Sequence, residues 1–206
     1  MKYTLVCLAL LHAIASAGYV PVGLASGYET DADWLRYDDG TPAWITWEGA
    51  YRGVWFNLED FTPGLSEIEI EEAELWFYHQ SVITGWDTSS FYFEIWNGAL
   101  APAALLDQTT VTALHYAPAF VFYPTSILAE NNFWCITNTA LSSGGWPSNL
   151  SDGISPGVIY HSFHSDDFID WEPWDMNGAC NYFVAIRGWP PDGLNALTWG
   201  ALKTTF

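Results

Sequence analysis

The sequence contains few basic residues. Only 5 of its 206 residues are Lys or Arg, against 24 Asp or Glu, which gives a formal net charge of −19 at pH 7. A field of this sign repels phosphate groups and anionic lipid surfaces, so it argues against nucleic-acid and membrane-surface partners. It suits a soluble extracellular protein and leaves many carboxylates free to bind divalent cations.

The chain also lacks a hydrophobic run long enough to cross a bilayer, which takes about 20 apolar residues. The apolar run 5–14 is too short, and the uncharged windows 108–129 and 131–151 are broken by prolines, glycines or polar residues. Lys2, the short run and the Ala-Ser-Ala at 15–17 instead form a secretory signal peptide. We expect cleavage before Gly18, no membrane span, and a secreted protein, extracellular or at the cell surface. Its mature chain has 189 of the 206 residues and, without Lys2, a charge of −20.

Cysteine is scarce. Cys7 lies in the predicted signal peptide, so the mature chain keeps Cys135 and Cys180. Two cysteines in an exported domain are usually paired, and both lie in strand-like segments, so we predict a disulfide between them. Two buried free thiols are the alternative.

Strong catalytic motifs are absent from the sequence. It contains no H-E-x-x-H or P-loop pattern. Residues 153–157, G-I-S-P-G, match the letters of G-x-S-x-G, but that motif indicates a catalytic serine only between a strand and a helix, and the chain has little helical periodicity. A glycosidase needs two carboxyl groups held across a cleft, and nothing in the sequence selects two of its many carboxylates. We therefore predict that the protein is not an enzyme and that it needs no cofactor, with calcium as the one candidate ion.

What the chain does have is apolar and aromatic material, 50% and 17% of its residues. In residues 67–78, E-I-E-I-E-E-A-E-L-W-F-Y, apolar and acidic residues alternate with a period of two. This alternation predicts a central strand with one solvent-exposed face. The alternation slips by one residue at Glu71-Glu72. Such a slip would turn the strand inside out, so we predict a β-bulge or a corner there.

Short strands separated by Gly, Pro, Asn and Asp turns continue along the chain, with little helical periodicity. We predict a hairpin over 44–56 and strands over 91–96, 109–114, 120–123, 132–137, 158–163 and 182–187. This pattern predicts an all-β fold, an antiparallel β-sandwich of jelly-roll type. The domain should cover residues 30–191, after an extended N-terminal segment at 18–29 and before a C-terminal tail at 192–206.

The densest polar cluster lies between residues 161 and 175. Asp166, Asp167 and Asp170 have the loop carboxylates that calcium prefers, although a merely solvated acidic loop fits the pattern too. His161 and His164 are three apart, so on a strand they point to opposite faces, which argues against zinc.

Four tryptophans fall in predicted loops: Trp86, Trp146, Trp171 and Trp174. Exposed indoles stack on sugar rings or on protein partners, whereas buried ones cover the ends of a sandwich. Both readings stay open. The sequence Asn149-Leu150-Ser151 is formally a glycosylation sequon.

Several segments resemble the β-sandwich domains that recur in large secreted bacterial proteins. They are E-A-E-L-W-F-Y (72–78), F-Y-F-E-I-W-N-G (91–98), N-F-W-C-I (132–136), H-S-F-H-S-D-D (161–167) and Y-F-V-A-I-R-G (182–188). The ending T-W-G-A-L-K-T-T-F (198–206) looks like the tail that follows such domains. The resemblance implies a non-catalytic accessory or surface module, while a domain that forms the whole mature product favours an autonomous role.

Two functions fit best. The first is a structural or adhesive extracellular protein, such as a self-assembling subunit of a fibre or surface layer, in which an end segment pairs outside its own domain. The second is a carbohydrate-binding module that uses the loop tryptophans; a hydrolase comes third. The expected partners are copies of the chain, other extracellular proteins or glycans.

Overall fold

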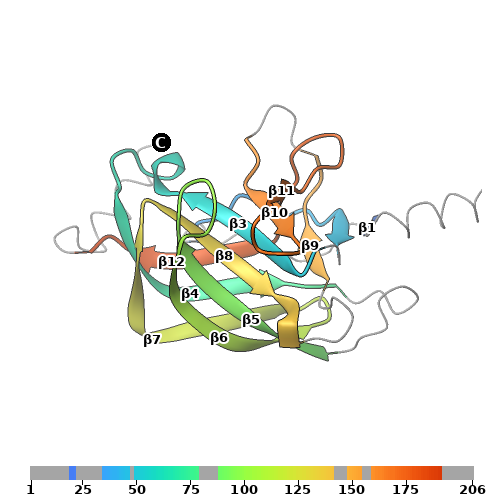
Figure 1. Cartoon of the computed structure of the whole chain (residues 1–206), viewed down its shortest axis with the longest axis horizontal. Coiled ribbons are helices and arrows are strands. Elements are labelled where there is room, and N and C mark those ends of the chain that lie inside the picture. Colours follow the sequence, from blue (N-terminus) through green and yellow to red (C-terminus); the bar gives the residue numbers. More distant parts are fainter. Residues whose placement is uncertain are drawn as a thin grey trace, which may run out of the picture.

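The computed structural model describes residues 19–21, 34–46, 49–78, 88–141, 148–154 and 159–191 (Figure 1). The predicted signal peptide, most of the N-terminal segment and the C-terminal tail lie outside these residues. The strands are β1 (Tyr19–Pro21), β2 (Trp44–Thr46), β3 (Tyr51–Asn57), β4 (Glu67–Trp76), β5 (Thr88–Asn97), β6 (Ala104–Leu114), β7 (Pro118–Glu130), β8 (Asn132–Asn138), β9 (Asn149–Ser151), β10 (Ser162–Ser165), β11 (Glu172–Pro173) and β12 (Val184–Trp189). Two short 3₁₀ turns, Leu58–Asp60 and Thr139–Leu141, are the helical elements among the described residues.

The strands form three antiparallel sheets. A six-stranded sheet has the order β11-β10-β3-β8-β5-β6, and two three-stranded sheets have the orders β12-β4-β7 and β1-β2-β9. The six-stranded sheet packs against the β12-β4-β7 sheet, as Figure 1 shows, and the main hydrophobic core lies between them. The predicted antiparallel β-sandwich is therefore confirmed.

Strand β4 has the bulge that its sequence predicts. Ile68 and Ile70 are fully buried before the slip, and so are Ala73 and Leu75 after it. The pairing of β4 with β7 shifts register between Ile70 and Glu72, and its pairing with β12 shifts at the facing point. The irregularity keeps apolar side chains in the core on both sides of the slip, because a regular strand would have turned one set outward.

The predicted hairpin over 44–56 is wrong. β2 pairs with β1 and β9, whereas β3 pairs with β8 and β10 in the six-stranded sheet. The chain passes between the sheets at Gly49, which has a φ of +78°. A Cβ atom there would lie 3.0 Å from the Cβ of His164, so glycine is needed for the conformation and for the close approach to β10.

The strand predicted over 158–163 lies further along the chain, as β10 (Ser162–Ser165). His161 precedes it, although its carbonyl still accepts a hydrogen bond from the backbone N–H of Trp55 at 2.7 Å. Strands β6 and β7 are longer than predicted. β7 runs through Pro124, which lacks an N–H but is tolerated because β7 is an edge strand.

Candidate functional site

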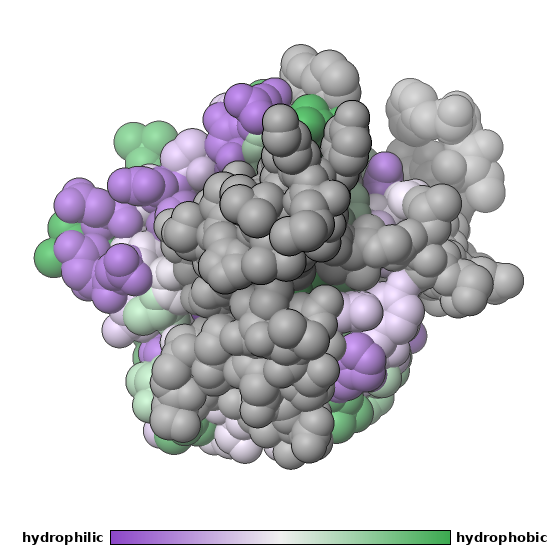
Figure 2. Space-filling model, turned by 90° about the vertical axis from the view of Figure 1, so that its right-hand side faces the viewer, coloured by the Kyte–Doolittle hydropathy of each residue, from purple (hydrophilic) through white to green (hydrophobic). Residues whose placement is uncertain are grey.

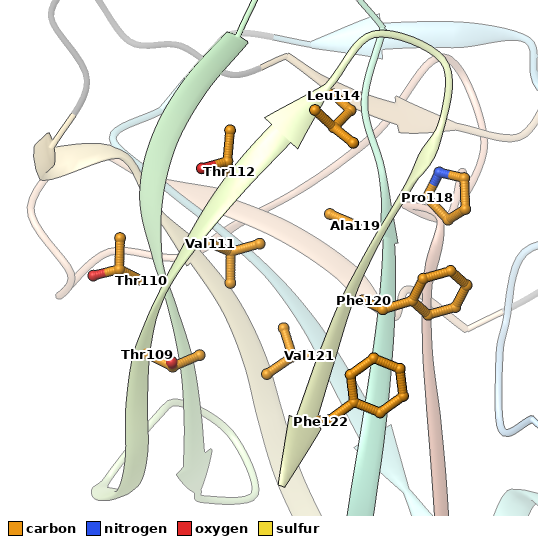
Figure 3. A pocket seen from close by; sticks show the side chains of 10 residues that line it. All are labelled: Thr109, Thr110, Val111, Thr112, Leu114, Pro118, Ala119, Phe120, Val121 and Phe122. Atoms are coloured by element: carbon orange, nitrogen blue, oxygen red, sulfur yellow. The ribbon is translucent and has the colours of Figure 1, made fainter.

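An open groove lies between β6 and β7. These strands follow each other in the chain, meet at a bridge between Leu114 and Ala117, and belong to different sheets. The groove has a volume of about 390 Å³ and is lined by residues 109–112, 114 and 118–122. Figure 3 shows Val111, Ala119 and Val121 turned toward the space between the strands, with Phe120 and Phe122 on the other side of β7.

Both walls of the groove are sheet edges. Among the described residues, β6 has a ladder with β5 alone and β7 with β4 alone, so each strand has one side without a neighbouring strand. A strand edge of this kind presents backbone N–H and C=O groups that an extended chain can pair with. The groove therefore combines a hydrophobic floor with two edges able to form backbone hydrogen bonds.

Aromatic side chains extend this surface on the outer face of β7. Phe120 and Phe122 are 45% and 66% exposed, and their ring centroids lie 6.1 Å apart. The buried Trp34 ring is 6.4 Å from Phe120 and carries the Arg187 guanidinium 5.4 Å above it. Large exposed aromatics beside an open strand edge are typical of a contact surface.

Hydrophilic side chains gather on another part of the surface. Figure 2 shows described hydrophilic residues toward the upper left of the view, with hydrophobic residues scattered among them.

The acidic loop after β10 forms a smaller cleft of about 220 Å³. Its lining is His164, Ser165, Asp166, Asp167, Asp170 and Glu172. Asp167 Oδ1 accepts hydrogen bonds from the backbone N–H groups of Ile169 at 2.8 Å and Asp170 at 3.0 Å. These bonds lower the pKa of Asp167, so this carboxylate shapes its own turn.

Within the described residues, no group of three or more His, Cys, Asp and Glu side chains is arranged to hold a metal ion. The calcium expectation for Asp166, Asp167 and Asp170 stays a prediction.

The same loop covers the outer face of the six-stranded sheet. Phe168 packs against Tyr51 and Trp96, with centroid distances of 5.0 and 4.9 Å. Trp171 packs on Trp134 at 5.1 Å. Gly53 forms the floor, and a Cβ atom there would lie 3.1 Å from both indoles. The two rings of Phe168 and Trp171 thus form a second aromatic layer outside the sandwich.

The four candidate tryptophans are placed differently. Trp174 is 2% exposed, belongs to the main core and donates its indole N–H to Ser151 Oγ at 2.9 Å. Its ring has no exposed face on which a sugar could stack. The prediction that Trp174 is a ligand-binding candidate is therefore wrong, and the residue is part of the core. Trp171 is partly exposed. Trp86 and Trp146 lie outside the described residues.

The predicted disulfide is not formed, because Cys135 and Cys180 are both free and buried. Cys135 points into the core from β8, where its neighbours across the sheet are Val54 and Ile95. Burial raises the pKa of the Cys180 thiol to about 12 and raises that of Cys135 as well. The structure therefore agrees with the alternative to a disulfide, two buried and inert free thiols.

His161 is held in an aromatic stack and not in a metal cluster. Its ring lies between Tyr37, at a centroid distance of 3.5 Å, and Trp55, at 5.4 Å. Its Nδ1 is 3.1 Å from the Trp55 carbonyl oxygen and its Nε2 is 3.7 Å from Asp60 Oδ2. Burial lowers the pKa of His161. His164 instead packs toward Trp174.

Sequence reasoning missed a pair of buried carboxyl groups. Asp38 and Asp152 are 6% and 0% exposed, and burial raises the pKa of each to about 7. Asp38-Asp39-Gly40 and Asp152-Gly153 both have the composition of exposed turns, so no local signal in the sequence distinguishes them. Their burial depends on chain segments that are far apart in sequence.

No helix among the described residues is long and apolar enough to span a membrane. Comparisons of the chain with protein families, with characterised proteins and with solved structures found no match.

Proposed function

We propose that the protein is an exported structural or adhesive protein, without catalytic activity, that associates with copies of itself through the β6–β7 groove. The observation that carries this proposal is the open groove between two long edge strands, β6 and β7. Proteins that stay monomeric protect such edges with charged residues, especially lysine. Residues 108–129, which include most of both edges, contain no Asp, Glu, Lys or Arg in a chain with 29 such residues.

Export is supported by the three-part signal sequence at residues 1–17. The absence of catalysis is supported by the positions of the acids. Asp38 and Asp152 have the raised pKa values that a hydrolase acid requires, but both are buried and neither lines the groove or the acidic cleft.

The test exchanges exposed groove residues for lysine. Thr112 and Phe122 are both exposed and line the groove, so Thr112→Lys with Phe122→Lys should leave the fold intact. Leu100 is 96% exposed and lies outside the groove, which makes Leu100→Lys the matched control. We expect the mature protein and the control to assemble in sedimentation velocity and electron microscopy, and the double variant to stay monomeric. A native protein that is monomeric at its highest soluble concentration would reject the proposal.

A glycan-binding role has one supporting observation, the partly exposed Trp171 beside the acidic cleft. Under this second proposal, Trp171→Ala should abolish retention on a glycan array while the far-ultraviolet spectrum stays native-like. The role is rejected if the native protein is not retained by any glycan.

A further inference from the structure

The β6–β7 groove has a polar end. In the pairing of β6 with β5, Asp107 lies opposite Ile95 and Val111 lies opposite Phe91, and both partners are fully buried. Since paired residues of an antiparallel ladder point to the same face, Asp107 lies on the inner face of β6, in line with Val111 of the hydrophobic floor. The groove thus continues along β6 from apolar side chains to a carboxylate.

Two polar atoms at this end are buried and have no hydrogen-bond partner among the described residues. They are Asp107 Oδ2 on β6 and the Tyr123 hydroxyl on β7. Burial raises the pKa of Tyr123, and the neighbouring Cys135 and Asp107 raise it further. A buried polar atom without a partner is costly, and native structures satisfy nearly all of them. This end of the groove therefore favours a ligand that brings a hydrogen-bond donor or a cation.

Residues 194–206, L-N-A-L-T-W-G-A-L-K-T-T-F, have the composition that such a groove requires. We name them the donor segment; they lie outside the described residues. The donor segment contains none of the 24 acidic residues of the chain, and its one charged side chain is Lys203. It can therefore enter an apolar groove without burying an unpaired carboxylate.

The order of side chains on the donor segment matches the order on β6. Leu197, Trp199 and Ala201 precede Lys203 at a spacing of two, so an extended chain presents all four on one face. From the β6–β7 turn, the inner face of β6 presents Ala113, Val111, Thr109 and then Asp107 at the same spacing. Three uncharged side chains followed by opposite charges coincide when the two strands run antiparallel.

The N-terminal part of the mature chain fits the groove less well. Tyr19–Pro21 already pairs with β2 as β1. Residues 22–33 include Glu29, Asp31 and Asp33, which add negative charge beside the Asp107 carboxylate.

We propose that the donor segment of one copy lies in the β6–β7 groove of a second copy, as an extended strand antiparallel to β6. Leu197, Trp199 and Ala201 then cover the hydrophobic floor, and the Lys203 ammonium pairs with the Asp107 carboxylate. This inference rests on the self-association proposed above and names the part of the partner that the groove takes.

The donor segment of the same copy cannot reach this position. Trp189 lies opposite Glu69, which lies opposite Leu128, so the chain leaves β12 level with Leu128 of β7. Ala119, at the far end of the groove, is about 30 Å from Leu128 along β7. Residues 190–196 span at most about 25 Å, and they would also have to pass around the sheet before Leu197 could enter at that end. The antiparallel arrangement therefore requires a second copy.

The ion pair at Lys203 leaves the long-range electrostatics unchanged. One pair does not outweigh the repulsion between two mature copies that each carry a charge of −20. Added salt is therefore still expected to strengthen association.

The test mixes two full-length mature variants that each lack one half of the contact. The groove variant is Thr112→Lys with Phe122→Lys, and the donor variant is Trp199→Lys. In sedimentation velocity each variant alone should be a monomer. Their equimolar mixture should form a heterodimer, because one copy keeps its donor segment and the other keeps its groove. The control Leu100→Lys should assemble as the native protein does.

A fluorescent peptide of residues 194–206 measures the charge pair separately. By fluorescence anisotropy it should bind the donor variant, whose groove is intact, and should not bind the groove variant. The peptide with Lys203→Glu should bind at least about tenfold more weakly, because two carboxylates then meet at Asp107. The matched peptide with Lys203→Arg keeps the charge and should bind like the native peptide.

This inference and the proposed function fail in different ways. A native protein that is monomeric at its highest soluble concentration rejects both. If the native protein and the donor variant both assemble, the copies meet edge to edge and the donor segment is not the occupant. A donor variant that assembles at lower concentration than the native protein would show that the segment covers the groove of its own copy. A mixture without heterodimer, or a peptide that does not bind the donor variant, also overturns the inference.

Discussion

Glu94 is a buried acid that stabilises the six-stranded sheet through three side-chain donors. It is 3% exposed and accepts hydrogen bonds from Trp96 Nε1, Gln108 Nε2 and Asn138 Nδ2 at 2.7–2.8 Å. These donors come from three adjacent strands, β5, β6 and β8. The carboxylate thus joins the centre of the sheet to its edge strand.

Removing this acceptor should be strongly destabilising, because it leaves N–H groups without a partner. We expect Glu94→Ala to lower the free energy of unfolding by about 3 kcal/mol, measured by urea denaturation. Glu67→Ala removes an exposed carboxylate and should change it by less than about 0.5 kcal/mol. Equal effects of the two substitutions would show that the three donors find other acceptors.

His161 should make stability depend on pH below about 6.5. The groups that face its ring are Tyr37, Trp55 and Asp60, and burial lowers its pKa below the ordinary value of 6.5 despite the Asp60 carboxylate. Since the unfolded chain then takes up the proton first, this histidine contributes a loss of stability as the pH falls from about 6.5 to its folded pKa. The full contribution is present above pH 6.5.

The measurement is the difference between native protein and His161→Gln in urea unfolding at several pH values. The variant should lose this part of the pH dependence, whereas His115→Gln, at an exposed position, should keep it. A native-like pH profile in His161→Gln would contradict the assignment.

At the scale of elements, two opposing contributions to stability meet at Phe168, in the loop that covers the six-stranded sheet. This residue has a φ of +67°, which costs a residue with a Cβ roughly 1 kcal/mol, while its ring packs on Tyr51, Trp96 and Trp171. Both Phe168→Ala and Phe168→Gly lose the packing, but glycine alone relieves the backbone.

We therefore expect both variants at Phe168 to be less stable than the native protein, with Phe168→Gly about 1 kcal/mol more stable than Phe168→Ala in urea unfolding. Ile169→Ala is the control, since Ile169 is 77% exposed on the same loop. If alanine is as stable as glycine, the loop can leave the left-handed conformation at little cost.

Elements could be predicted from sequence where the signal is local. The period of β4 and its slip at Glu71-Glu72 require a bulge whatever the rest of the chain does. Sheet membership is not local: β2 pairs with β1 and β9 and β3 pairs with β8 and β10, strands that lie far apart in the sequence, so the predicted hairpin was wrong.

Candidate site residues, too, could be predicted only where the sequence signal is local. The buried positions of Trp174 and Asp152 arise from contacts such as Trp174 with Ser151 and Asp152 with Asn181, which no spacing in the sequence indicates. The cysteines looked suited to a bridge because both precede or occupy strands, yet each packs separately in the core.

For the whole molecule, the charge distribution opposes the contact that the groove offers. The chain carries 24 acidic and 5 basic residues, so two copies repel each other over the distance at which their charges are unscreened. Residues 108–129 are uncharged, so the groove itself adds no repulsion at close range. Association should therefore be limited by long-range repulsion and driven by the hydrophobic contact and backbone pairing.

Salt should then strengthen self-association, in contrast to an interface built on ion pairs. Raising NaCl from about 0.01 to 0.1 M shortens the screening length from about 30 to 10 Å, and we expect the association constant to rise by roughly a factor of ten. Sedimentation velocity with a chelator present separates this effect from calcium binding. The Thr112→Lys, Phe122→Lys variant should remain monomeric at both salt concentrations, because it places charge in the groove. An association that weakens with NaCl would mean that the copies meet through opposite charges on another face, since only salt-bridged contacts lose affinity when both partners are screened.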